Sequence, residues 1–252
     1  MFTTIAYSES LDPEAAYVNH AGVPDPHVAV NGDYIYIPDF ASMLIGCWVG
    51  ADNTVAPGAY LQSPSLLAAA PYHIDPIDVA IAPVNHDAVH LHPENPFALK
   101  AMEGMEALIQ CNPGAATVQA LVAFLADGPL SKVTGEIIKL RFTAAITETV
   151  SVWSNGAITL SDNLPVGKYA IVGAKMYGTS GVAFRFVLPG EAHRPGMICA
   201  ATENNQVHPL SRNGGLGVWG EFDSRVLPTI DWLAVATAGM AQVGVMDLIK
   251  VG

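Results

Sequence analysis

The first 99 residues of this sequence contain no lysine and no arginine, and the first basic residue is Lys100. They contain eleven acidic residues, a formal charge of −11; the rest has eleven basic and twelve acidic residues, a charge of −1, which together give −12. An acidic segment without cations cannot form internal salt bridges, so it must be solvated, bind cations or face basic groups of a neighbour. The same absence excludes a basic arm that holds nucleic acid through its phosphates.

Charge is scarce throughout the chain. Only 13% of the residues are charged and 51% are hydrophobic, whereas a typical domain has roughly 25% charged residues. Much of the surface must therefore be apolar or neutral, which in a soluble chain indicates contacts with partners. No apolar run approaches the ~20 residues that span a bilayer, and no N-terminal signal peptide is visible.

Sequence motifs of catalysis are missing as well. No nucleophile elbow, phosphate-binding loop or dinucleotide fingerprint occurs, and Ser180 lies in a Gly-Thr-Ser-Gly turn with no base nearby in the sequence. Cys47, Cys111 and Cys199 form no CxxC pair, which favours reduced, buried thiols in a chain made in a cytoplasm. We therefore predict no enzyme, no catalytic residue, no cofactor site and no metal site.

The stretch 164–190 predicts two β-strands around a tight turn. Pro165 and Gly167 open the first strand, residues 178–181 supply the turn, and Pro189 closes the second strand. Both strands are apolar on nearly both faces. We expect a hairpin that is covered on both sides, as in a sandwich within an assembly.

The rest of the chain divides into an acidic β-rich part (1–94), a pair of short helices (95–129) and a β-sandwich (130–252). Proline and glycine turns separate short extended runs in the first and last parts. Asn31-Gly32 is the best hairpin signal of the first part. The predicted strands are 2–7, 27–30, 34–37, 43–49, 79–82, 133–145, 149–154, 157–160, 197–202, 216–222, 229–237 and 242–251.

The helical pair rests on capping signals and spacing. Asn95-Pro96 and Asn112-Pro113 each place a capping residue before a proline at the first helical position. Apolar residues then recur at roughly helical spacing, and the second segment ends at Asp127-Gly128-Pro129. The sequence therefore predicts two helices that pack against a sheet.

A histidine cluster is the densest polar feature. On a strand His90 and His92 share a face, and with His86 and Glu94 they would form a metal site. A cupin, a small jelly-roll enzyme, places two histidines in this way, but its leading glycine, its downstream glutamate and its second motif are missing here. Structural or surface histidines are therefore favoured over a metal.

A solvated face is likewise favoured over calcium binding for the acids Asp33, Asp39, Asp75, Asp78 and Asp87.

Aromatic residues and arginines mark the last part of the chain. The aromatic residues would form a carbohydrate platform in a binding module, but at strand spacing they favour a core; they are Trp153, Trp219, Trp232, Phe184, Phe186 and Phe222. The arginines are spread singly, and we expect them to meet the acidic part of a neighbouring copy unless divalent cations fill that contact; they are Arg185, Arg194, Arg212 and Arg225.

The strand count and spacing over residues ~130 to 252, with the closing segments 215–222 and 228–236, resemble the jelly-roll major capsid proteins of prokaryotic viruses. The resemblance implies an all-β, non-catalytic shell subunit. We expect a double jelly roll, with a single elaborated sandwich as the alternative. The implied partners are copies of the chain, as a trimer or larger, and other shell proteins. The implied location is the virion, assembled in the host cytoplasm; a cupin-like enzyme and a carbohydrate-binding module remain the alternative functions.

Overall fold

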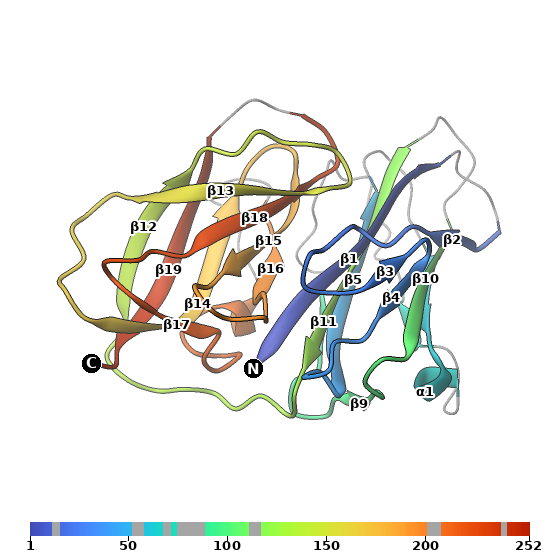
Figure 1. The fold of residues 1–252 in the computed structure, drawn as a ribbon, viewed down its shortest axis with the longest axis horizontal. Helices are drawn as coiled ribbons and strands as arrows, with labels where there is room; N and C mark the ends of the chain where they lie inside the picture. Colours follow the sequence, from blue (N-terminus) through green and yellow to red (C-terminus); the bar gives the residue numbers. More distant parts are fainter. Residues whose placement is uncertain are drawn as a thin grey trace.

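A computed structural model of the chain describes residues 1–11, 16–51, 58–67, 72–74, 89–110, 117–200, 208–237 and 241–252. Strands make up 55% of the chain and helices 3%, so the all-β prediction is confirmed. The helical elements that are described are α1 (Pro64–Leu67) and a 3-10 turn at Pro209–Ser211. Two β-rich halves lie side by side, residues 1–126 and 138–252, with a linker between them (Figure 1).

The N-terminal half contains two antiparallel sheets. The first has the order β1-β11-β5-β8, with β9 also paired to β5; its strands are β1 (Phe2–Leu11), β11 (Thr117–Ala126), β5 (Met43–Ala51), β8 (His90–Leu91) and β9 (Phe97–Ala98). The second has the order β3-β4-β10-β6-β7, with β2 also paired to β10; its strands are β2 (Val18–His20), β3 (Val30–Asn31), β4 (Tyr34–Tyr36), β10 (Gly104–Gln110), β6 (Gly58–Gln62) and β7 (Tyr72–Ile74).

The hairpin predicted at Asn31-Gly32 is confirmed. β3 and β4 pair antiparallel, with Asn31 opposite Tyr34 and Val30 opposite Ile35. Gly32 has a φ of 61°, a left-handed conformation that glycine adopts without a steric cost.

The C-terminal half is one curled sheet of eight strands. Its order is β16-β15-β18-β13-β12-β19-β14-β17, from β12 (Ile138–Ala144), β13 (Trp153–Leu160), β14 (Lys168–Tyr177), β15 (Gly181–Val187), β16 (Gly196–Ile198), β17 (Gly220–Asp223), β18 (Thr229–Ala234) and β19 (Gln242–Lys250). One end of β13 pairs with β18 and the other end with β12. β13 therefore joins two groups of four strands, β12-β19-β14-β17 and β13-β18-β15-β16, which enclose a core.

The two halves repeat one order of pairing. In the C-terminal half the first strand, β12, lies beside the last, β19, and in the N-terminal half β1 lies beside β11. The second group of each half is β13-β18-β15-β16 and β4-β10-β6-β7. No repeat of fixed period is visible in the sequence, so the pairing order recurs without an obvious repeat of the residues.

Two apolar clusters fill the molecule. One lies inside the N-terminal half and includes Ile5, Leu44 and Leu121. The other fills the C-terminal half and continues onto the outer side of the β1-β11-β5 sheet, where Phe2 packs edge-on against Trp219 with ring centroids 5.3 Å apart. This shared cluster joins the two halves.

The helical pair predicted for 95–129 is wrong. Residues 104–110 form β10 and residues 117–126 form β11, the central strands of the two N-terminal sheets. β10 alternates, with Met105, Ala107 and Ile109 buried. β11 is buried on both faces, and a continuous apolar run fits a helix and a covered strand equally well. The cap predicted at Asn112-Pro113 and the strand predicted at 79–82 lie outside the described residues.

The stretch 164–190 forms its two strands, β14 and β15, and the turn between them, where the Gly181 amide donates to the Gly178 carbonyl at 3.3 Å. The prediction that they pair as a hairpin is wrong. β14 pairs with β19 and β17, whereas β15 pairs with β18 and β16. Both strands are almost entirely buried, as expected. Each strand lies between two others within its sheet, as expected for a strand that is apolar on both faces.

Candidate functional site

A buried ionic network lies where the two halves meet. Arg185 on β15 points away from its own sandwich, since its neighbours Phe184 and Phe186 belong to the apolar interior. The Arg185 side chain is 0% exposed. Its Nε donates to Asp231 Oδ2 at 2.9 Å, and its Nη1 donates to the Thr4 carbonyl at 3.0 Å and to Asp25.

A second arginine supports the same junction. The Arg194 side chain contacts His27, its backbone amide donates to Thr3 Oγ1 at 3.0 Å, and its carbonyl accepts from the Thr4 amide at 2.9 Å. Arg194 is 6% exposed, and burial lowers the pKa of its guanidinium. The Arg185 guanidinium also lies 4.2 Å from the centre of the Trp153 ring, a cation–π contact. The junction is therefore a packed, charged connection between the halves.

This network corrects the expectation that Arg185 meets acids of a neighbouring copy. Arg185 binds Asp25 of the acidic part, but within the same chain. Two more arginines have acidic partners nearby: Arg212 pairs with Asp247 at 2.7 Å and Arg225 with Asp223 at 2.6 Å. The expectation was wrong for Arg185 because the charge split of the sequence does not say whether a pair forms within or between chains. For Arg194, Arg212 and Arg225, a contact with a neighbouring copy stays a prediction.

The outer side of the β4-β10-β6 sheet carries a group of tyrosines. We call Tyr17, Tyr34, Tyr36 and Tyr60, with Glu106 among them, the tyrosine face. Tyr17 and Tyr60 pack with ring centroids 4.8 Å apart, and Tyr17 and Tyr34 are 41% and 42% exposed. These rings form an open aromatic surface beside a groove of about 500 Å³ that Tyr34, Tyr36 and Glu106 line.

Glu106 is held at the centre of the tyrosine face. Its Oε2 accepts from Asn19 Nδ2 at 2.9 Å and its Oε1 from Gln62 Nε2 at 3.2 Å. The charge of the Glu106 carboxylate has the largest effect in raising the pKa of Tyr34, and its hydrogen bond, burial and the charge of Asp33 raise it further. The face is therefore negative, and no lysine or arginine precedes Lys100 in the sequence to offset it.

The outer side of the β12-β19-β14 sheet has the opposite character. We call Lys139, Arg141 and Lys175, with Val243 and Val245 between them, the basic face. The pairing register places Arg141 and Lys175 on either side of Val245 in one row. Side chains of the alternate residues Leu140, Phe142 and Met246 fill the interior beneath.

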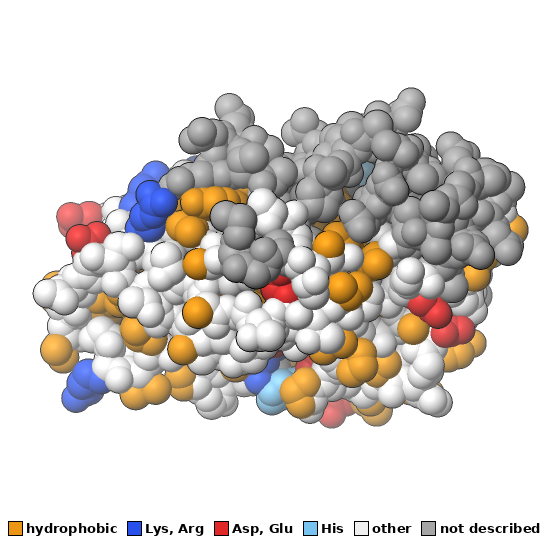
Figure 2. All heavy atoms as spheres, turned by 90° about the horizontal axis from the view of Figure 1, so that it is seen from above, with side chains coloured by type: hydrophobic (Ala, Val, Ile, Leu, Met, Phe, Trp, Pro, Cys, Tyr) orange, Lys and Arg blue, Asp and Glu red, His pale blue; other side chains and the backbone are white. Residues whose placement is uncertain are grey.

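The acid of this sheet is neutralised within the chain. Asp247 is buried and accepts from Arg212 Nε at 2.8 Å, Arg212 Nη2 at 2.7 Å and the Asn213 amide at 2.8 Å. Burial alone would raise the pKa of Asp247, but these hydrogen bonds outweigh it and the pKa is lowered. Asp247 therefore does not offset Lys139, Arg141 and Lys175, the cations that the described part of this face carries. Figure 2 shows the same difference between the halves. Among its coloured side chains, the right-hand part, over the N-terminal half, has Asp and Glu (red) but no Lys or Arg (blue).

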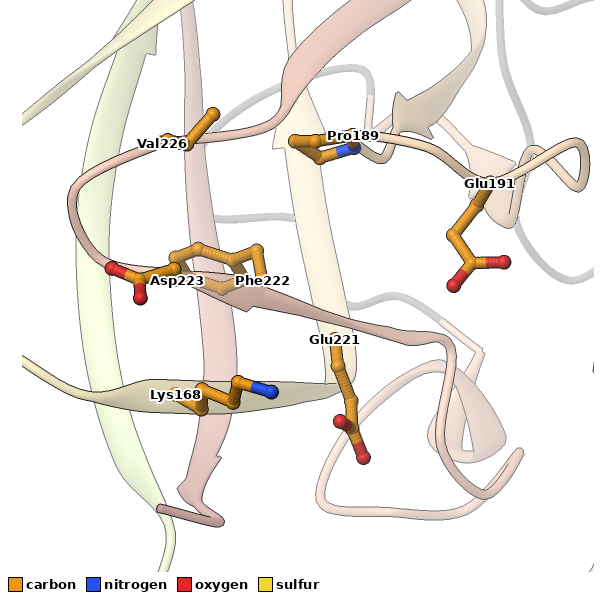
Figure 3. A pocket seen from close by; sticks show the side chains of 7 residues that line it. All are labelled: Lys168, Pro189, Glu191, Glu221, Phe222, Asp223 and Val226. Atoms are coloured by element: carbon orange, nitrogen blue, oxygen red, sulfur yellow. The ribbon is translucent and has the colours of Figure 1, made fainter.

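An open groove lies at the β17 edge of the C-terminal half (Figure 3). Lys168, Glu191, Glu221 and Asp223 line its sides and Phe222 forms part of its wall, with a volume of about 390 Å³. Hydrogen bonds from the Arg225 side chain, then from its backbone, hold the pKa of Asp223 well below its usual range. The groove offers charges of both signs, which suits polar contacts.

The histidines that were considered as metal ligands, His90 and His92, lie beside β5. His90 begins β8 opposite Cys47, and His92 packs edge-on against Phe97 with centroids 5.1 Å apart. His86 lies outside the described residues, as do Asp75, Asp78, Asp87 and Cys111. Within the described ranges, no group of three His, Cys, Asp or Glu side chains is arranged to hold a metal.

Five of the six aromatic residues considered in the C-terminal half are core residues, as favoured from the sequence, and Trp153 is half-buried beside them. Trp219, Trp232, Phe184 and Phe186 are 0% exposed and Phe222 is 4% exposed. These five rings therefore offer no surface on which a sugar ring could stack.

A cluster of hydrogen bonds around Glu148 was not predicted from the sequence. Glu148 Oε1 accepts from Ser180 Oγ at 2.5 Å, from Trp232 Nε1 at 3.0 Å and from Gln242 Nε2 at 3.0 Å. Burial, with a smaller effect of Glu148, raises the pKa of the Cys199 thiol. The cluster ties four segments together at one end of the sandwich and leaves the thiol protonated. The partners lie 32 to 94 residues apart, so no local signal could have revealed them.

No protein family, no curated protein and no solved structure matches this chain. The surfaces themselves are therefore the basis for a functional conclusion.

Proposed function

We propose that this chain is a self-assembling structural protein, a subunit of a viral shell, built as a double jelly roll. The observation that carries the proposal is the pairing order. A jelly roll is an eight-stranded sandwich of two four-stranded sheets. In one sheet the spatial order of the strands is first, eighth, third and sixth. In the other sheet the order is second, seventh, fourth and fifth.

The C-terminal half follows this order strand by strand. Numbered from β12, its two groups are first-eighth-third-sixth (β12-β19-β14-β17) and second-seventh-fourth-fifth (β13-β18-β15-β16). The N-terminal half follows it when β1 is the first strand and the β3-β4 hairpin the second, with the groups β1-β11-β5-β8 and β4-β10-β6-β7. Two rolls in one chain support a subunit in which each roll makes contacts of its own.

The interiors support a structural role over an enzyme. Large side chains such as Phe142, Phe186 and Met246 fill the C-terminal sandwich, and Leu61, Met105 and Leu121 fill the N-terminal one. A jelly-roll enzyme needs an interior that accommodates its ligand or metal. The strand order alone also suits a cupin-like enzyme, with His86, His90 and His92 as ligands. The packed interiors make it the second candidate.

The surface composition supports partners of the same kind. A low share of charged residues predicts that much of the outer surface is covered in an assembly, and the two outer faces described above carry opposite charge. The structure describes no helix long and apolar enough to cross a membrane. We propose copies of this chain as the main partners, in trimers or larger rings, and the virion as the location.

Light scattering on the purified chain, followed by electron microscopy of the same sample, tests the proposal. We expect a mass of at least three chains of 26.5 kDa, and shell fragments or closed particles at high concentration. A mass of one chain at every concentration would overturn it. Elemental analysis is the control for the second candidate, since stoichiometric zinc, iron or manganese would favour the enzyme.

A further inference from the structure

We propose that the tyrosine face of one copy binds the basic face of a second copy, head to tail. The inference rests on the proposed function and names the surfaces that the assembly uses. The occupant of each face is thus another copy of this chain, and every copy offers one face of each kind.

The contact between the two halves is the first argument. The outer side of the β1-β11-β5 sheet, which contains the first and last strands of its half, is buried against the C-terminal half. Arg185, which pairs with Asp231 on the outer side of the β15-β18 group, meets Thr4 and Asp25 there. One group of the N-terminal half thus packs against the other group of the C-terminal half.

That arrangement leaves two groups whose outer sides are not part of the contact between the halves in the described part of the chain, although the segment around Arg212 covers one of them beside Gly173 and Asp247. They are the second group of the N-terminal half, which carries the tyrosine face, and the first group of the C-terminal half, which carries the basic face. A second copy can therefore repeat between chains the kind of contact that already exists within one chain.

Charge complementarity is the second argument. Glu106 and Asp33 give the tyrosine face its sign, and Lys139, Arg141 and Lys175 give the basic face the opposite sign. Complementary potentials steer association and fix its orientation, whereas like charges placed opposite each other cost several kcal/mol. Two tyrosine faces, or two basic faces, would therefore repel each other.

The apolar atoms of the faces are the third argument. Tyrosine is enriched at protein interfaces because it combines a large apolar ring with a polar hydroxyl. The basic face offers the half-buried side chains of Val243 and Val245, on which such rings can pack. Because the two faces differ, the contact is heterologous, and it closes into a ring if its rotation allows.

Charge reversal tests the inference. One variant carries Lys139→Glu and Arg141→Glu, and another carries Asp33→Lys and Glu106→Lys. We expect each to weaken association by at least about tenfold, and the variant that combines all four changes to recover it, because the signs again oppose. Lys100→Glu, at an exposed position on neither face, is the matched control and should associate like the native chain.

Circular dichroism and thermal unfolding establish that each variant is folded. If a reversed variant does not fold, the salt dependence of the native chain supplies the test, since we expect association to weaken as sodium chloride shortens the Debye length below ~8 Å. Reversed variants that assemble like the native chain would overturn the face assignment and leave the proposed function intact. A native chain that is monomeric at every concentration would overturn the proposed function itself.

Discussion

The two halves of this molecule share a pairing order but differ in how they use charge. In the C-terminal half, arginines pair with acids of the same half, as in Arg212–Asp247 and Arg225–Asp223. The described part of the N-terminal half has one basic residue, Lys100, and its acid Asp25 pairs with Arg185 of the other half. The same order of strands therefore forms in a half whose described part has a single basic side chain, because apolar burial is the main driving force of folding. Surface charge is then free to specify contacts.

The largest expected effect comes from removing the cation at the junction of the halves. Arg185→Ala leaves the carboxylates of Asp25 and Asp231 buried without their partner, which costs about 3–5 kcal/mol. The free energy of unfolding from urea titration measures the loss.

The matched control removes the acids as well. Arg185→Met with Asp25→Asn and Asp231→Asn leaves no buried charge at this site, so it should lose much less stability than Arg185→Ala. If the two variants lose the same amount, the packing of the arginine side chain matters more than its charge, and the comparison between the halves weakens.

A pair of core substitutions compares the two halves directly. Leu121→Ala in the N-terminal interior and Leu248→Ala in the cluster that both halves share each remove a fully buried side chain. Each should cost about 2–5 kcal/mol. Because the shared cluster couples the halves, we expect one cooperative transition by both fluorescence and circular dichroism. Two separate transitions in Leu121→Ala would mean that the halves unfold independently.

The smallest effect concerns an ion pair inside the C-terminal half. Asp247→Asn removes the charge from hydrogen bonds with Arg212 and should cost about 2 kcal/mol. The pKa of Asp247 is lowered in the folded chain, so its stabilisation is present above about pH 4 and is lost as the pH falls through the folded value. Urea titrations at pH 7 and pH 3 should therefore give a larger difference between native and variant at pH 7. An equal difference at both pH values would contradict this role of the charge.

The fold could be predicted from sequence where strands alternate or where turns carry glycine. The strands of the C-terminal half and the Asn31-Gly32 hairpin are of this kind. The error at β10 and β11 arose because Asn-Pro capping signals precede apolar runs there. A covered strand lacks the polar alternation that would have distinguished it from a helix. Partner choice within a sheet, as for β14 and β15, is a tertiary property and has no local signal.

The candidate surfaces were only partly predictable. The charge split indicated that the acidic part meets basic groups, and this is seen where Arg185 meets Asp25. These two residues are 160 positions apart, so their pairing depends on how the halves dock. The tyrosine face combines residues of β10, β6 and β4 with Tyr17, which lie far apart in the sequence until the sheet aligns them.

Hydroxyl-radical footprinting of the native chain, dilute and concentrated, tests most directly whether the tyrosine face is an assembly contact. We predict that labelling of Tyr17 and Tyr34 falls as the assembly forms, because their rings become covered. Phe97 and Met102, which are 41% and 59% exposed and lie on neither face, should be labelled equally in both samples. Unchanged labelling of the two tyrosines in a sample whose mass has risen to several chains would contradict the account.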